Sequence, residues 1–265
     1  NKKYWNSGSD LNIKSWDRLF PKNIHIHIYS EDGPLEGLSS RVTWYDLYKT
    51  CPNLLKFIDK HKDNPHYNGE SAPSDTQKYK WNAIKFAHKT FPIFRQARDT
   101  TGVLIWLDAD VLAIQPLAHN QLRNIVPENY CVNYLGRPRT HSECGYVTYN
   151  LDHQLGLDFI KHFESYYYNN KLSTLLQTHD SYVFDRARES FGHTEIFNDM
   201  NKDTQTTEGF HCSFVRNCNS KLISSIQDPH QHKKIFPCRQ SRVPCNMSNQ
   251  DLGGPGKTCE IPIRH

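Results

Sequence analysis

The octapeptide VLIWLDAD, residues 103–110, joins five consecutive apolar residues to an Asp-Ala-Asp sequence. A continuous apolar run of this length, preceded by Thr100-Thr101-Gly102, is typical of a strand buried on both faces of a parallel sheet. In α/β folds, ligands bind beyond the carboxyl ends of such strands. The octapeptide therefore predicts an α/β fold with a ligand site at Asp108 and Asp110.

Patterns typical of helices and strands alternate on both sides of this strand. Pro52-Asn53 interrupts a helical pattern over residues 41–63, and Pro92 predicts a kink or break in a helix over residues 79–97. Regular patterning fades from about Asn198, so we expect an α/β sheet domain with an irregular C-terminal extension. The remaining expected elements are helices over residues 13–20, 155–168 and 181–190, strands over 23–29, 130–135 and 146–150, and a polar loop over 63–77.

Composition narrows the class of protein. The 265 residues are 37% apolar and 12% aromatic, which is typical of a globular chain and excludes a disordered one. No run approaches the roughly 18 consecutive apolar residues that a membrane-spanning helix needs. The net charge of +4 comes without a Lys/Arg block, so nucleic-acid binding is not expected.

Asp108 and Asp110 carry the sharpest chemical signal. Two carboxylates two residues apart at a strand end suit Mg²⁺ or Mn²⁺, which are commonly held by one or two carboxylates together with substrate phosphates. The spacing alone also fits a turn in which an aspartate caps the next segment. The apolar strand directly before the pair favours the metal-binding interpretation.

The segment 103–112 resembles the strand and metal-binding motif of nucleotide-sugar glycosyltransferases of the GT-A fold, especially the retaining family 8 type. Three further segments occur in the order of that family. HSECGYVTYN (141–150) resembles the strand lining the donor-sugar pocket, THDSYVF (178–184) the segment that supplies a carboxylate near the reacting carbon, and KFAHKTF (85–91) the helix with a basic donor contact. The resemblance spans residues 23–234 and implies a Rossmann-like, mixed and mostly parallel sheet flanked by helices.

The resemblance also assigns site residues. It makes Asp108, Asp110 and His230 the ligands of Mn²⁺ or Mg²⁺, and Lys89 a contact of the donor diphosphate. It makes Asp180 and Glu143 the catalytic carboxylates that orient the sugar. Further donor contacts are implied at Ala109, Gly145 and His179.

Several residues depart from the family pattern or fit a second interpretation. Glu143-Cys144 stands where the family has Asn, and His232 competes with His230 because residues 228–234 lack the usual Gly. Asp180 also fits a helix N-cap, and Lys89 fits a side chain that extends from the edge of the core to solvent. The family's first strand is expected before Asn1.

Five of the eight cysteines lie in the C-terminal part, at 212, 218, 238, 245 and 259. Their spacings lack the short loops of zinc ribbons, so disulfides in an oxidising compartment are the better explanation. Asn246-Met247-Ser248 is a glycosylation sequon that suits the same compartment. Disulfides would place the protein in the secretory lumen or outside the cell, and free thiols would place it in the cytoplasm. We expect a catalytic domain over residues 1–235 and an extension over 236–265.

Together these features predict a metal-dependent glycosyltransferase that moves a hexose from a nucleoside diphosphate sugar, with UDP favoured, to a hydroxyl of a glycan, protein or lipid. Retention of configuration follows from the resemblance. Two alternatives remain: a sugar-1-phosphate nucleotidyltransferase, which would need a Gly-rich loop after its first strand, and a non-catalytic carbohydrate-binding module, which would bind sugar without metal.

Overall fold

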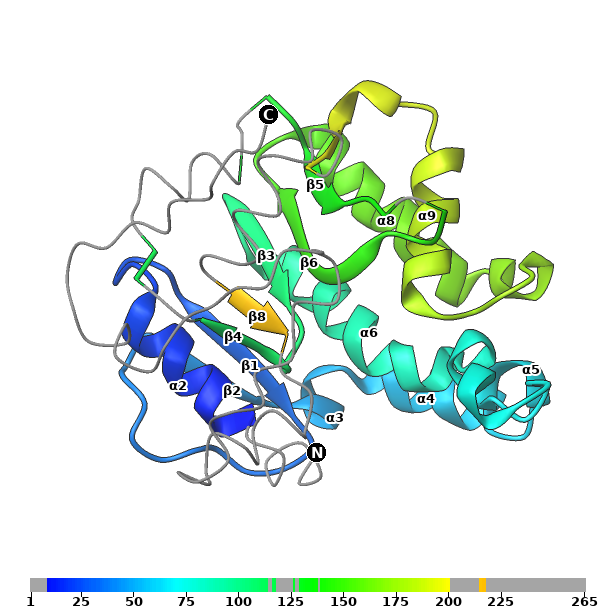
Figure 1. Cartoon of the computed structure of the whole chain (residues 1–265), viewed down its shortest axis with the longest axis horizontal. Coiled ribbons are helices and arrows are strands. Elements are labelled where there is room, and N and C mark those ends of the chain that lie inside the picture. Colours follow the sequence, from blue (N-terminus) through cyan, green and yellow to red (C-terminus); the bar gives the residue numbers. More distant parts are fainter. Residues whose placement is uncertain are drawn as a thin grey trace, which may run out of the picture.

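The computed structural model describes residues 9–113, 116–117, 126, 129–137, 139–200 and 215–217, and the structural statements below refer to these. Helices and strands alternate along them, so the α/β class is confirmed (Figure 1). The helices are α2 (Ser9–Leu19), α3 (Leu47–Thr50), α4 (Pro52–His61), α5 (Pro65–Asn68), α6 (Ala83–Asp99), α8 (Gln154–Tyr168) and α9 (Asp180–Ser190), with 3-10 helices η1 (Asp75–Trp81), η2 (Lys171–Thr174) and η3 (Thr194–Ile196). The strands are β1 (Ile26–Ser30), β2 (Val42–Asp46), β3 (Val103–Leu107), β4 (Val111–Ala113), β5 (Val132–Leu135), β6 (Glu143–Asn150), β7 (Phe197–Asp199) and β8 (Val215–Asn217).

The described strands form three sheets. β1 pairs with β2, β4 pairs with β8, and the largest sheet has the order β3-β6-β5-β7. The β1–β2 and β5–β7 pairs are parallel, whereas β3–β6, β5–β6 and β4–β8 are antiparallel. The sheet content is therefore mixed as expected, but the prediction of a mostly parallel sheet is wrong for the described strands.

β3 shows why its apolar run misled the prediction. It lies at the end of its sheet, where its pairing partner is the antiparallel β6, and Val103 is 40% exposed. Its two faces nevertheless meet two different cores: Leu104 and Trp106 pack against the larger one, and Ile105 and Leu107 against the smaller one. A continuous apolar run thus indicates that both faces of a strand are covered, but it does not indicate whether the neighbouring strand is parallel or antiparallel.

The larger core lies between the four-stranded sheet and helices α4, α6, α8 and α9, and it is rich in aromatic rings such as Phe94, Phe159, Phe163 and Phe184. The smaller core is formed by α2, β1 and β4 around Ile13, Trp16 and Val111. Figure 1 shows α2 on the opposite side of the molecule from α8 and α9. Asp108 and Asp110 lie between β3 and β4, where the two cores meet.

The predicted helices over 155–168 and 181–190 and the strands over 130–135 and 146–150 are confirmed as α8, α9, β5 and β6. The helical interpretation of 41–46 is wrong, because these residues include β2, which pairs in parallel with β1. The expected loop over 63–77 contains α5 and the start of η1, and the helix expected from Tyr79 begins at Ala83.

Pro92 does not break α6, although proline removes one helical hydrogen bond. Pro92 is itself buried, as are Phe91 and Ile93 beside it, and this packing holds the helix together across the missing bond. Among the described helices, none has the length and apolar character required to cross a membrane. The C-terminal cysteines, the sequon and the predicted extension over 236–265 lie outside the described residues.

Candidate active site

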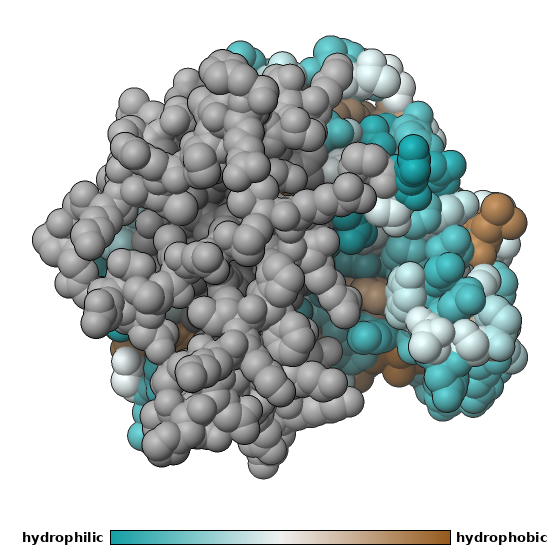
Figure 2. Space-filling view, viewed as in Figure 1, coloured by the Kyte–Doolittle hydropathy of each residue, from teal (hydrophilic) through white to brown (hydrophobic). Residues whose placement is uncertain are grey.

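A cleft of about 1110 Å³ opens beside the end of β3. Its lining comes from η1, the start of α6, the segment between β5 and β6, and α9, and it includes four of the predicted site residues: Asp108, Glu143, His179 and Asp180. The described surface seen in Figure 2 is mostly hydrophilic, with scattered hydrophobic residues. Most of the side chains that line the cleft are themselves polar or charged, so the cleft suits a polar ligand.

At the base of this cleft, one lysine joins two carboxylates. Lys89 Nζ lies 2.7 Å from Asp108 Oδ1 and 2.8 Å from Asp180 Oδ2, and it donates a third bond to the carbonyl of Cys144. We call Lys89, Asp108 and Asp180 the Lys89 centre. The Lys89 side chain is only 13% exposed, so the interpretation of a lysine extending to solvent is wrong.

Burial and charge compete in the Lys89 centre. Burial opposes the ammonium form of Lys89, but the carboxylates of Asp108 and Asp180 outweigh it and hold the pKa of Lys89 above its ordinary value. Burial likewise opposes ionisation of Asp180, and Lys89 outweighs it, so the pKa of Asp180 lies below its ordinary value. For Asp108, burial dominates and raises the pKa. Asp180 is thus held as a carboxylate beside the cleft.

Asp110 has the environment expected of a cation ligand. Burial, with a contribution from Asp108, raises the pKa of Asp110 to about 6. Its Oδ1 is buried and has no hydrogen-bond partner among the described residues. A buried acceptor without a partner costs about 1–3 kcal/mol. A bound cation would supply the missing partner for this oxygen.

The charges and donor atoms fit Mn²⁺ or Mg²⁺. With its groups ionised, the Lys89 centre carries one positive and two negative charges, and Asp110 adds a third negative charge. Within the described part of the chain, no group of three His, Cys, Asp or Glu side chains is arranged to hold a metal ion. Two carboxylates completed by ligand phosphates and water are a common Mg²⁺ arrangement. His230 and His232 lie outside the described residues.

Helix α2 fixes the backbone around the two aspartates with neutral side chains. Asn12 Nδ2 donates to the carbonyl of Ala109 at 2.7 Å, and Trp16 Nε1 donates to that of Val111 at 2.8 Å. Ser15 Oγ accepts from the amide of Ala113 at 3.0 Å. Positions 12, 15 and 16 share one helix face, which explains how a single helix binds alternate residues of the chain. Ala109, one of the predicted donor contacts, is thus held in place by the hydrogen bond from Asn12 to its backbone carbonyl.

Glu143 and Gly145 line the other side of Asp108. Glu143 Oε1 accepts from the amide of Gly145 at 2.9 Å, and the amide of Asp108 donates to the carbonyl of Gly145 at 3.0 Å. A Cβ on Gly145 would lie 3.1 Å from Glu143 Oε1 and 3.4 Å from Asp108 Oδ2. Glycine thus allows both carboxylates to approach this strand. Glu143 Oε2 also pairs with Arg137 Nη1 at 3.0 Å.

His179, rather than Asp180, is the N-cap of α9. Its Nδ1 accepts from the amide of Tyr182 at 3.4 Å, and its Nε2 lies 3.0 Å from Gln177 Oε1. The N-cap prediction for Asp180 is therefore wrong: Asp180 is the first residue of the helix and its side chain binds Lys89. Burial lowers the pKa of His179 to about 4, so this imidazole is neutral at pH 7.

The predicted residues from four distant segments thus come together around one cleft. Sequence reasoning missed Asn12, His141 and Asp185, because each acts through a contact with a residue far along the chain. Arg137, which follows β5, pairs with Glu143 through its guanidinium.

No protein-family model matches the chain, and no curated protein matches it. Among solved structures, the chain is similar to the crystal structure of mouse Xyloside xylosyltransferase 1 in its apo form. The two chains are 14% identical, with a TM-score of 0.40, and the similarity covers 80% of this chain and 88% of the other. We therefore base the function on the residues of the cleft.

Proposed function

We propose that the protein is a metal-dependent glycosyltransferase that moves a sugar, a hexose on the family resemblance, from a nucleoside diphosphate donor to a hydroxyl acceptor. The observation that carries the proposal is the buried oxygen of Asp110 without a partner, beside the paired Lys89 centre. This arrangement suits a divalent cation that bridges to a diphosphate. The hydrophilic cleft beyond it suits a sugar rather than an apolar substrate.

Each residue has a distinct task in this proposal. Asp108 and Asp110 would hold Mn²⁺ or Mg²⁺, which when bound offsets the charge of the departing diphosphate. Lys89 holds Asp108 and Asp180 in fixed positions. Asp180, kept ionised by Lys89, would stabilise positive charge at the reacting carbon of the sugar.

Retention of configuration is part of the proposal and rests on the family resemblance alone. In that case the acceptor oxygen bonds to the anomeric carbon on the face that the diphosphate leaves. The departing phosphate oxygen takes the acceptor proton, and no separate base is required. UDP as the donor nucleotide rests on the same resemblance.

Donor hydrolysis and transfer, measured for a panel of UDP-, GDP- and CMP-sugars with Mn²⁺, with and without EDTA, test the proposal. We expect EDTA to abolish turnover, excess Mn²⁺ to restore it, and Asp110→Ala to lower it at least about a hundredfold, since a metal ligand is lost. Asp158→Ala, which removes a half-exposed aspartate on α8, is the matched control and should keep wild-type turnover. Turnover that survives both EDTA and Asp110→Ala would refute the metal assignment.

Calorimetry separates this function from a carbohydrate-binding module. A transferase should bind UDP with Mn²⁺ and lose that binding in Asp110→Ala. A binding module has no reason to recognise UDP, so sugar binding that needs neither UDP nor metal would favour it.

A further inference from the structure

Four aromatic side chains form a continuous wall along the cleft, starting next to Asp180. The ring of His179 lies 5.5 Å from that of Tyr79, 6.1 Å from that of Phe86 and 5.2 Å from that of His141. All four rings line the cleft. We call Tyr79, Phe86, His141 and His179 the ring wall. Of these four, only His179 is a donor contact by the family resemblance, and Tyr79, Phe86 and His141 have no task in holding the donor.

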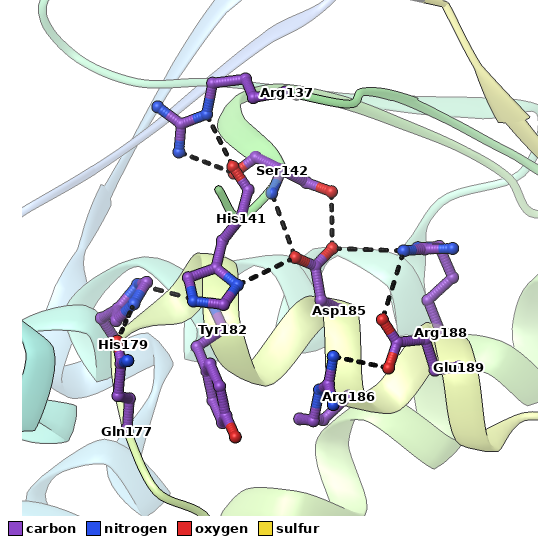
Figure 3. A network of polar contacts seen from close by, with 10 residues as sticks. All are labelled: Arg137, His141, Ser142, Gln177, His179, Tyr182, Asp185, Arg186, Arg188 and Glu189. Atoms are coloured by element: carbon purple, nitrogen blue, oxygen red, sulfur yellow. Dashed lines mark hydrogen bonds and ion pairs between the residues drawn. The ribbon is translucent and has the colours of Figure 1, made fainter. Parts of the chain in front are cut away.

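The ring wall is fixed in place by its neighbours. His141 Nδ1 lies 3.3 Å from Asp185 Oδ2, and the ring of Tyr182 meets His141 edge-on at 4.9 Å. Asp185 is itself anchored, because Ser142 donates to it from both its amide and its hydroxyl. Figure 3 shows His141 and His179 side by side, with Asp185 on the far side of His141. Rings held in this way lose little freedom when a ligand binds.

Tyr79 is the ring most available to a ligand. It is 44% exposed and lines the cleft, so its ring is accessible to a ligand. Its segment is joined to the segment before α9, because the carbonyl of Lys80 accepts from the amide of Thr178 at 2.7 Å. An exposed ring in a fixed position offers a flat surface to a ligand that has both apolar and polar faces.

The charges around the ring wall indicate what that ligand is. Four arginines line the cleft, and three of them lie against a carboxylate: Arg137 against Glu143, Arg186 against Glu189, and Arg188 against Asp185. With Arg139 and Lys80 included, the lining holds five basic and six acidic side chains, so neither sign of charge dominates. Paired arginines and carboxylates still offer hydrogen-bond donors and acceptors, but they attract no net charge. Most of the remaining lining is polar, which disfavours a lipid chain. A neutral saccharide, with C–H faces and many hydroxyls, matches both features.

We propose that the ring wall is the acceptor subsite and that the acceptor is a neutral saccharide stacked on Tyr79. The inference rests on the proposed transferase function, since it names the acceptor of that same site. It narrows the acceptor from glycan, protein or lipid to the first of these.

Binding is tested first, without donor or metal, by saturation-transfer difference NMR with methyl β-glucoside, methyl β-galactoside and methyl β-xyloside. Wild-type protein should give a signal with at least one of them. Tyr79→Ala should remove that signal and Tyr79→Phe should keep it, because the ring rather than the hydroxyl forms the contact. Tyr168→Ala is the matched control, since Tyr168 is 40% exposed on α8 outside the cleft lining.

Transfer to the glycoside that binds is tested next, with the donor that wild-type protein hydrolyses. Tyr79→Ala should raise the KM for the glycoside about tenfold, as for the loss of one strong contact, and leave donor hydrolysis within about twofold of wild type. Saccharide binding or transfer that Tyr79→Ala leaves unchanged would overturn the inference, as would transfer to a peptide or lipid hydroxyl alone.

The two proposals fail in different ways. If wild-type protein shows no metal-dependent donor hydrolysis but binds a glycoside through Tyr79, the transferase function falls and the saccharide site stands. If hydrolysis depends on metal but no glycoside binds at Tyr79, the saccharide acceptor is wrong and the transferase function stands.

Discussion

The two flanks of the Asp108-Ala109-Asp110 turn are built on different principles. On one flank, the charged side chains of the Lys89 centre bind one another. On the other, the neutral side chains of Asn12, Ser15 and Trp16 bind the backbone of the turn and of β4. The neutral flank is buried, and so is the charged flank except at Asp108, whose side chain is 33% exposed in the cleft lining; the main difference between the flanks is therefore one of charge.

This difference separates the reactive part of the site from its support. Charged groups can exchange partners with a charged ligand, so the Lys89 flank is where a diphosphate and a cation would change the local balance. Hydrogen bonds between neutral side chains and the backbone do not exchange partners with a charged ligand in this way, so they only hold the turn in place. Substitutions on the two flanks should therefore differ in size, in pH dependence and in their effect on activity.

Lys89→Met should have the largest effect. It leaves the buried Asp180 without its partner cation, and also Asp108, whose side chain is 33% exposed; breaking a buried ion pair such as Lys89–Asp180 costs about 3–5 kcal/mol. Urea unfolding at pH 7 measures the loss. Lys161→Met is the matched control, because the 69% exposed Lys161 forms a surface pair with Asp158, and surface pairs contribute about 0–1 kcal/mol. A Lys89→Met protein within 1 kcal/mol of wild type would show that the charged flank does not hold the site together.

Stability should also depend on pH through His179, the residue directly before Asp180 of the charged flank. Burial is the main cause of its lowered pKa of about 4; His141 and Arg137 lower it further, whereas Asp180 and Asp185 oppose the shift. Because the unfolded chain binds a proton near pH 6.5 and the folded one does not, stability contributed by neutral His179 is lost as the pH falls from about 6.5 towards 4. From pH 7.5 to pH 4.5 this loss is about 2.5 kcal/mol.

His179→Asn isolates that contribution, since an asparagine side chain still caps α9 but does not titrate. The difference in unfolding free energy between wild type and His179→Asn, measured by urea titration at both pH values, should shift by about 2.5 kcal/mol in favour of the variant at the lower pH. A difference that stays constant with pH would show that His179 titrates normally in the folded protein.

The sequence predicted the parts of this site that depend on local pattern. The strand β3, the Asp-x-Asp turn and helix α9 follow from apolar runs and spacing, which are visible within one segment. The antiparallel partner of β3 did not follow, because side-chain alternation does not encode strand direction.

Partners far along the chain were also beyond the sequence. From the sequence, Lys89 fitted either a side chain at the edge of the core or a contact of the donor diphosphate. The structure shows that its ammonium group lies against the carboxylates of Asp108 and Asp180. His179 took the N-cap role that Asp180 fitted equally well by spacing. Asn12 gave no signal, because a neutral side chain on an amphipathic helix has no distinctive pattern.

Asn12→Ala tests the neutral flank and should have the smallest effect of the three. It removes the bond to the carbonyl of Ala109 but also removes Asn12 Oδ1, a buried oxygen without a partner among the described residues, so we expect a loss of only about 1 kcal/mol. Unlike the His179 contribution, the loss should be the same at pH 7.5 and pH 4.5, since no titratable group is removed.

The exposed Arg18→Ala on the same helix is the control and should stay within about 0.5 kcal/mol of wild type. Because the turn loses one support, the Mn²⁺ concentration for half-maximal donor hydrolysis should rise in Asn12→Ala and not in Arg18→Ala. A loss as large as that of Lys89→Met, or one that changes with pH, would mean that the two flanks are not distinct.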